Sequence, residues 1–126
     1  MGSPDVFKAG SALAGGVARS GETCGALTGA MMGVCCVVGR EKLEDRAQYG
    51  KAMEAAGRLY DSFRKEIGHS ICQEIHKIRY GKVYSLRNPK EREAFHNEGG
   101  HGPKGCPEVC GVAARIAAEI ILDAKK

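Results

Sequence analysis

The sequence has no tryptophan, few aromatic residues and no apolar run long enough to cross a membrane. The apolar segment over residues 24–39 carries no charged residue but has only 16 residues, whereas a membrane-spanning helix needs about 20. Neither sign of charge dominates, because 19 Lys and Arg against 15 Asp and Glu give a net charge of only +4. A nucleic-acid-binding domain usually carries a denser basic stripe. We therefore expect neither a membrane span nor a nucleic-acid interface.

The N-terminus also lacks the basic segment and long apolar segment that mark a secretory signal. A cysteine-rich chain in a reducing compartment more often binds metal or carries out redox chemistry than forms a disulfide framework. We therefore expect a cytoplasmic protein, with a periplasmic one as the alternative if a leader has been removed. Residues 1–5 are interpreted as a tag remnant or a frayed end.

Apolar residues recur at helical spacing over most of the chain, which predicts an all-α fold. The clearest pattern predicts a helix from Tyr49 to Ile67, and Gly68 ends it. Three further long helices are predicted, over residues 4–19, 23–39 and 106–126. A shorter helix follows a capping box whose first residue is Ser70.

No segment reads as a convincing strand, and residues 80–105 are polar and contain several helix-breaking pairs. This composition predicts a long loop, with at most a short helix near residues 91–95. We therefore predict a single helical domain, residues 1–126, built as a small bundle of about four to five helices with one long polar loop. The predicted core includes Met53, Ala56, Tyr60, Phe63, Ile67, Ala113, Ala117 and Ile120.

The six cysteines are the most informative residues, because four of them fall at expected helix beginnings. Cys24 opens the second helix, and Cys72 follows the capping residue of the short helix. Cys106 and Cys110 lie one turn apart where the last helix begins. Free amide groups and the positive dipole at a helix beginning stabilise an anion and lower the pKa of a thiol. The pattern therefore predicts a shared metal or redox site.

The second helix also carries cysteines and glycines with more ordinary interpretations. Cys35 and Cys36 lie in an apolar stretch, where a free cysteine is usually a small core residue. Gly29 and Gly33 continue a ridge without side chains, which predicts tight helix packing. For Gly25, next to Cys24, the close approach of a bound cofactor is an equally good interpretation.

Three parts of this pattern together resemble the C_GCAxxG_C_C family of redox-active proteins: GETCGALTGA at residues 21–30, the glycine four positions before Cys72, and the pair Cys106 and Cys110. The resemblance covers residues 10–124, and related sequence occurs in the C-terminal part of split-Soret cytochrome c. Many members begin with a further cysteine-bearing helix, and the sequence here starts without it.

The resemblance implies a helical domain that binds an iron–sulfur cluster of the 2Fe–2S type for electron transfer. Carried over to this sequence, the cluster ligands would be Cys24, Cys72, Cys106 and Cys110, with Gly25 beside the cofactor. No C-x-x-C-H motif is present, so a covalently attached c-type haem is not expected.

Three interpretations of the cysteines remain open. The first is an iron–sulfur centre for electron transfer or redox sensing. The second is a structural or regulatory zinc site, because Cys72 and His76 are one helical turn apart and His69 and His101 lie near the same cysteines in sequence. The third is a thiol–disulfide redox protein, although the usual C-x-x-C pair is absent.

The sequence does not identify an enzyme, because no phosphate-binding loop or catalytic-triad spacing is present. Basic side chains gather over residues 77–92, which indicates either a solvated loop or a docking surface for an acidic redox partner. The expected partner is therefore an unidentified redox protein, and a homodimer is left open.

Overall fold

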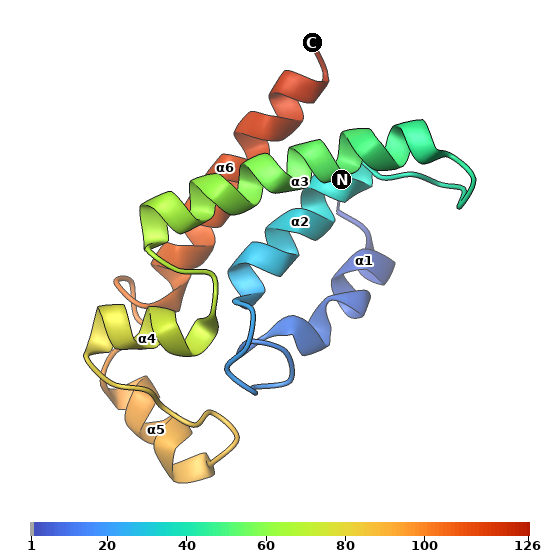
Figure 1. Ribbon diagram of the computed structural model, residues 1–126. Coiled ribbons are helices and arrows are strands. Elements are labelled where there is room, and N and C mark those ends of the chain that lie inside the picture. Colours follow the sequence, from blue (N-terminus) through green and yellow to red (C-terminus); the bar gives the residue numbers. More distant parts are fainter. Residues whose placement is uncertain (1) are drawn as a thin grey trace.

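The computed structural model describes residues 2–126, which form six α-helices and one short 3-10 helix and contain no β-strand (Figure 1). In chain order the elements are α1 (Pro4–Ala9), η1 (Ser11–Leu13), α2 (Gly25–Val38), α3 (Arg46–Ile67), α4 (Cys72–Tyr80), α5 (Pro89–Asn97) and α6 (Cys106–Ala124). The all-α prediction is confirmed, whereas four to five helices is too low a number. Met1, part of the segment interpreted as a tag remnant or frayed end, lies outside the described residues.

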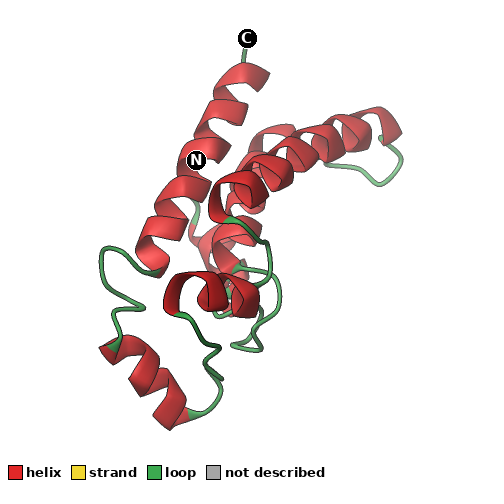
Figure 2. Cartoon of the chain, turned by 60° about the vertical axis from the view of Figure 1, so that its left-hand side comes forward, coloured by secondary structure: helices red, strands yellow, loops and turns green. Residues whose placement is uncertain are grey.

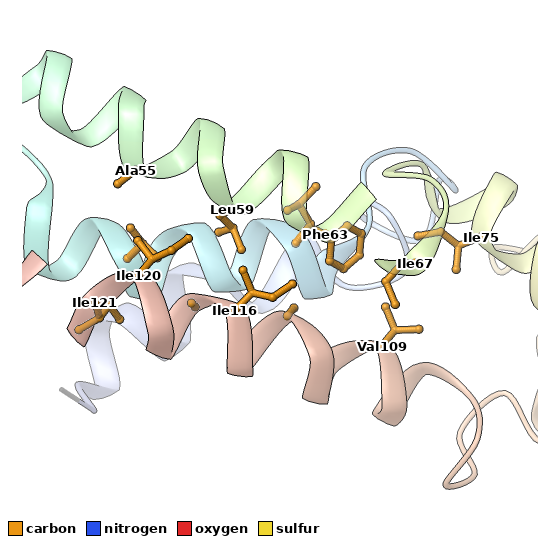
Figure 3. Packing of buried hydrophobic residues seen from close by; sticks show 13 residues of the cluster. Ala55, Leu59, Phe63, Ile67, Ile75, Val109, Ile116, Ile120 and Ile121 are labelled. Carbon is orange, nitrogen blue, oxygen red and sulfur yellow. The ribbon is translucent and has the colours of Figure 1, made fainter. Parts of the chain in front are cut away.

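Helices α2, α3 and α6 pack against one another and enclose the main core. Leu59 and Phe63 of α3 are fully buried and face Ile116 of α6 (Figure 3). Leu27 and Val34 supply the buried side of α2. Burial of a large apolar side chain contributes roughly 1.5–3 kcal/mol, so these contacts fix the three helices relative to one another.

The buried stripe of α3 is rotated relative to the predicted one. Met53, predicted as a core residue, is 55% exposed, and Ala56 and Tyr60 are only partly buried. The helix instead packs through its small residues Ala52 and Ala55, which let a neighbouring helix approach closely. The core prediction is confirmed at Phe63, Ile67, Ala113, Ala117 and Ile120.

The predicted helix over residues 4–19 is wrong beyond Ala9, where α1 ends. After η1 the backbone makes a left-handed turn, with φ of +67° at Gly15, +71° at Gly16 and +62° at Arg19. Glycine enters this region without steric cost, whereas each other residue pays about 1–2 kcal/mol. The glycine pair therefore begins a turn that no helix can continue through.

The predicted loop over residues 80–105 is divided by α5, which is longer than the short helix expected near residues 91–95. The Asn88 side chain accepts hydrogen bonds from the amides of Lys90 and Glu91, and Pro89 occupies the first helical position. Asn88 and Pro89, one of the pairs expected to break a helix, therefore begin one.

Helices α4 and α5 lie on the side of the core where α2 and α6 begin (Figure 1, Figure 2). Between them, Tyr84, Leu86 and Phe95 form a second, smaller core with Cys72. Within residues 2–126, no helix combines the length and the apolar character that crossing a bilayer requires.

Candidate functional site

The beginnings of α2, α4 and α6 surround one cavity of about 490 Å³. All four cysteines singled out from the sequence line it. Cys24 immediately precedes α2, Cys72 is the first residue of α4, and Cys106 and Cys110 lie in the first turns of α6. Cys35 and Cys36 are exposed on α2 outside the cavity, so the expectation that they are core residues is wrong.

A short antiparallel bridge between Thr23 and Ile71 brings the first two thiols together. The amide of Cys24 donates to the carbonyl oxygen of Ser70 at 2.9 Å, and the amide of Cys72 donates to the carbonyl oxygen of Glu22 at 2.6 Å. Two helix beginnings that are distant in sequence are therefore held side by side by backbone hydrogen bonds.

The same bridge replaces the predicted capping box. The residue that precedes α4 is Ile71, with no side-chain cap, and the hydroxyl of Ser70 lies 3.3 Å from that of Tyr60 instead. The ring nitrogen Nδ1 of His69 accepts from the amides of Ser70 and Ile71 at 2.9 and 3.0 Å. His69 therefore uses this nitrogen to order the backbone before α4.

The beginning of α6 is fixed to α4 by Arg79. One guanidinium nitrogen, Nη2, donates to the carbonyl oxygen of Lys104 at 2.8 Å and to the carboxylate of Glu108 at 2.6 Å. The amide of Cys106 donates to the carbonyl oxygen of Gly100 at 2.8 Å. These contacts hold the beginning of α6 near α4, and Cys106 packs against the smaller core that contains Cys72.

Burial raises the pKa of three of the thiols. The pKa of Cys72 rises to about 12 and that of Cys106 to about 11, first by desolvation and then by repulsion from neighbouring thiolates. Burial also raises the pKa of Cys24, although the amides of Ala26 and Leu27 oppose the shift. Neither amide is placed for a full hydrogen bond to the sulfur.

These shifts correct the prediction that helix beginnings lower the thiol pKa here. Removal from water destabilises a thiolate by more than the nearby amide dipoles stabilise it, so the neutral thiol is favoured in the metal-free chain. The mutual repulsion links Cys24 with Cys72, Cys106 and Cys110, which means that the four sulfur atoms are electrostatic neighbours.

His76 is buried directly beside Cys72, with 2% of its surface exposed. Its Nε2 lies 3.6 Å from the sulfur of Cys72, and its ring stacks on Phe95 with 4.6 Å between centroids. Burial lowers the pKa of His76, so the imidazole is neutral at pH 7. Its Nδ1 has no hydrogen-bond partner among the described residues.

The glycines of α2 differ in what lies next to them. At Gly25 a Cβ atom would lie 2.8 Å from the carbonyl oxygen of Leu13, so this glycine allows η1 to lie against α2 at the edge of the cavity. At Gly29 and Gly33 no described atom lies within 4 Å of that position. The expected tight helix packing at these two glycines is therefore wrong.

Sequence reasoning missed the rest of the cavity lining. It is formed by the left-handed turn, the segment before α5, and α5 itself, with Gly16, Arg19, Leu86, Arg92 and Phe95 among its residues. The only sequence signal for it was the glycine pair at positions 15 and 16, since the other residues come together through the tertiary fold.

Four thiols line the cavity as potential metal donors, but they form no preformed site for a single ion. Within residues 2–126, no three His, Cys, Asp or Glu side chains are close enough to hold one metal ion. Tetrahedral zinc needs its donors about 2.0–2.3 Å from a single point.

An all-helical domain with four thiols around one cavity has the character of a cysteine-rich redox protein. The pattern that defines the C_GCAxxG_C_C family, described as "Putative redox-active protein (C_GCAxxG_C_C)", matches residues 1–120. The chain belongs to this family, and the resemblance found in its sequence is confirmed. No curated protein and no solved structure matches the chain.

Proposed function

We propose that Cys24, Cys72, Cys106 and Cys110 bind an iron–sulfur cluster of the 2Fe–2S type in electron transfer or redox sensing. The observation that carries this proposal is the gathering of four thiols from three helix beginnings around one cavity. The redox-active description of the family supports the same class of function.

The residues around the thiols explain why a cationic centre would bind there. Desolvation and mutual repulsion keep the metal-free thiols protonated, and ferric ions would offset both effects by neutralising the thiolates. The amides of Ala26 and Leu27 face Cys24 and would stabilise the negative charge left on its sulfur. When bound, the cluster would accept and release one electron.

Zinc is the second candidate, and the contact between Cys72 and His76 favours it. A zinc site would recruit the neutral imidazole of His76 together with nearby thiolates. By contrast, a thiol–disulfide function is disfavoured, because raised thiol pKa values leave little of the reactive thiolate. All six cysteines are free thiols.

The wider setting is also part of the proposal. We place the protein in the cytoplasm, where a cysteine-rich chain keeps its thiols reduced, with the periplasm as the alternative. Its partner is a redox protein, and the basic residues over positions 77–92 offer a surface for an acidic one. A homodimer is compatible with this function.

Anaerobic isolation followed by iron and acid-labile sulfide analysis tests the proposal. We expect about two irons and two sulfides per chain, with visible absorption that zinc does not give. Single Cys→Ser changes at the four cavity cysteines should lower the iron content. Cys35→Ser and Cys36→Ser are matched controls, because both cysteines are exposed outside the cavity. Full iron content in Cys72→Ser and Cys106→Ser would contradict the ligand set.

A further inference from the structure

The cavity is larger than a two-iron cluster needs. Its volume of about 490 Å³ lies within the range of roughly 300–1,000 Å³ that is usual for small-molecule pockets. Two irons and two sulfides are four atoms, which take on the order of 100–150 Å³ if each fills about the volume of a water molecule. Most of the cavity is therefore left over, and its walls indicate what it can hold.

Beside the thiols, the lining of the cavity combines apolar surface with positive charge. Leu13, Leu86 and Phe95 supply the apolar surface, and Arg19 and Arg92 supply two guanidinium groups. No aspartate or glutamate lines the cavity within the described part of the chain. Unopposed positive charge beside apolar surface suits an anion that has an apolar body.

Arg92 is held in position but retains free donors. It is partly buried, and its Nη1 donates to the carbonyl oxygen of Leu86 at 2.8 Å. No other described acceptor bonds its guanidinium group, which leaves N–H groups for a carboxylate. Arg19 and Leu86 also line a neighbouring hollow of about 220 Å³. Both arginines therefore border the larger cavity, Arg19 from the left-handed turn and Arg92 from α5.

A second, independent observation comes from His76, which also lines the cavity. Its Nδ1 is buried without a partner among residues 2–126. A buried polar atom of this kind costs stability unless a ligand or a water molecule meets it. The cavity lining thus carries free charged donors, and one of its residues has a buried polar atom that lacks a partner.

We propose that the cavity binds a small organic carboxylate beside the thiols, with the carboxylate held by Arg92 and Arg19. The apolar body of that molecule lies against Leu86 and Phe95. This inference goes beyond the cluster, because the cavity and its arginines belong to the chain whether or not metal is bound.

Benzoate is a suitable probe, since it joins a carboxylate to an apolar ring, and benzamide is nearly the same shape without the charge. The full chain is isolated anaerobically with reductant. Each compound is titrated into it at low ionic strength, and binding is followed by NMR or calorimetry. We expect benzoate to bind at least tenfold more tightly than benzamide, a difference of about 1.4 kcal/mol. Equal affinities, or no binding of benzoate in the millimolar range, would overturn the proposal.

Two variants and one control locate the binding. Arg92→Gln should weaken benzoate binding at least tenfold, and Arg19→Gln, at an exposed position, should weaken it without a risk to folding. Lys90→Gln is the matched control, because this lysine is exposed on the same helix outside the cavity. If all three variants bind like the unchanged chain, or if Lys90→Gln loses affinity equally, the carboxylate does not lie at the arginines. Iron content is measured in parallel, so failure of the cluster proposal would be seen separately.

Discussion

Replacing Gly16 with alanine is the sharpest test of how the left-handed turn shapes the cavity. A Cβ atom at this position would lie 2.6 Å from the amide nitrogen of Glu22 and 2.7 Å from the Cβ of Cys72. Neither neighbour can move freely, because the amide of Cys72 bonds the carbonyl oxygen of Glu22. The backbone also has a φ of +71°, which disfavours any residue with a side chain.

The expected loss follows from these two effects. A left-handed residue other than glycine costs about 1–2 kcal/mol, and inserting a methyl group into a packed site costs typically 1–3 kcal/mol. Gly16→Ala should therefore lower the free energy of unfolding by about 2–5 kcal/mol, measured by denaturant titration. It should also move Cys72 and lower the capacity of the chain for iron.

Gly33→Ala is the matched control, since no described atom lies within 4 Å of its Cβ position and the residue is helical. Alanine in a helix is favoured over glycine by roughly 0.5–1 kcal/mol, so this variant should be slightly more stable than the unchanged chain. If Gly16→Ala unfolds within about 0.5 kcal/mol of the unchanged chain, a change usual for an unconstrained surface position, the packing of the turn against Cys72 is wrong.

Three further predictions concern charge at the site. Because burial lowers the pKa of His76 below its ordinary 6.5, the unfolded chain takes up a proton that the folded chain does not. The free energy of unfolding should therefore fall as the pH drops below about 6.5. His76→Phe should reduce this loss, and the same pH dependence in the variant and the unchanged chain would refute the role of His76. Because the folded pKa values of Cys72 and Cys106 are about 12 and 11, against an ordinary 9.0, the metal-free chain should lose stability as the pH rises above 9. Denaturant titrations at several pH values check this. In Cys72→Ser the free energy of unfolding should fall less steeply with pH, by up to about 1.4 kcal/mol per pH unit. Arg79→Met removes a partly exposed ion pair with Glu108 and a hydrogen bond to the backbone. It should lower the free energy of unfolding by about 1–2 kcal/mol and loosen α4 from α6. The loosening should be seen as faster amide exchange in α4, and unchanged exchange would contradict this role.

The sequence predicted those features that depend on local patterns. The period of apolar residues placed the helix ending at Ile67, and Gly68 ends it in the left-handed conformation with φ of +102°. The positions of Cys24, Cys72 and Cys106 at helix beginnings agree with the structure, because helix boundaries are marked by nearby glycine and proline residues. That these thiols share one cavity was an expectation from their similar positions.

Features that depend on tertiary contacts were not predictable in this way. The segment after Ala9 has apolar residues at helical spacing, yet Gly15 and Gly16 turn left-handed, and Gly16 lies against Glu22 and Cys72 beside the bridge. The thiol pKa values rise rather than fall because burial, which no local pattern reveals, outweighs the helix dipole. Arg19 and Arg92 reach one cavity from distant segments, so nothing in their neighbouring residues linked them.

X-ray absorption at the iron edge tests the central claim most directly, using the anaerobically isolated chain and its Cys72→Ser variant. The account predicts iron surrounded by about four sulfur atoms with a second iron as a near neighbour. In the variant, serine oxygen should replace one sulfur or the iron should be lost. Iron bound by nitrogen and oxygen, iron without an iron neighbour, or identical spectra for the two chains would contradict a cluster held by the cavity thiols.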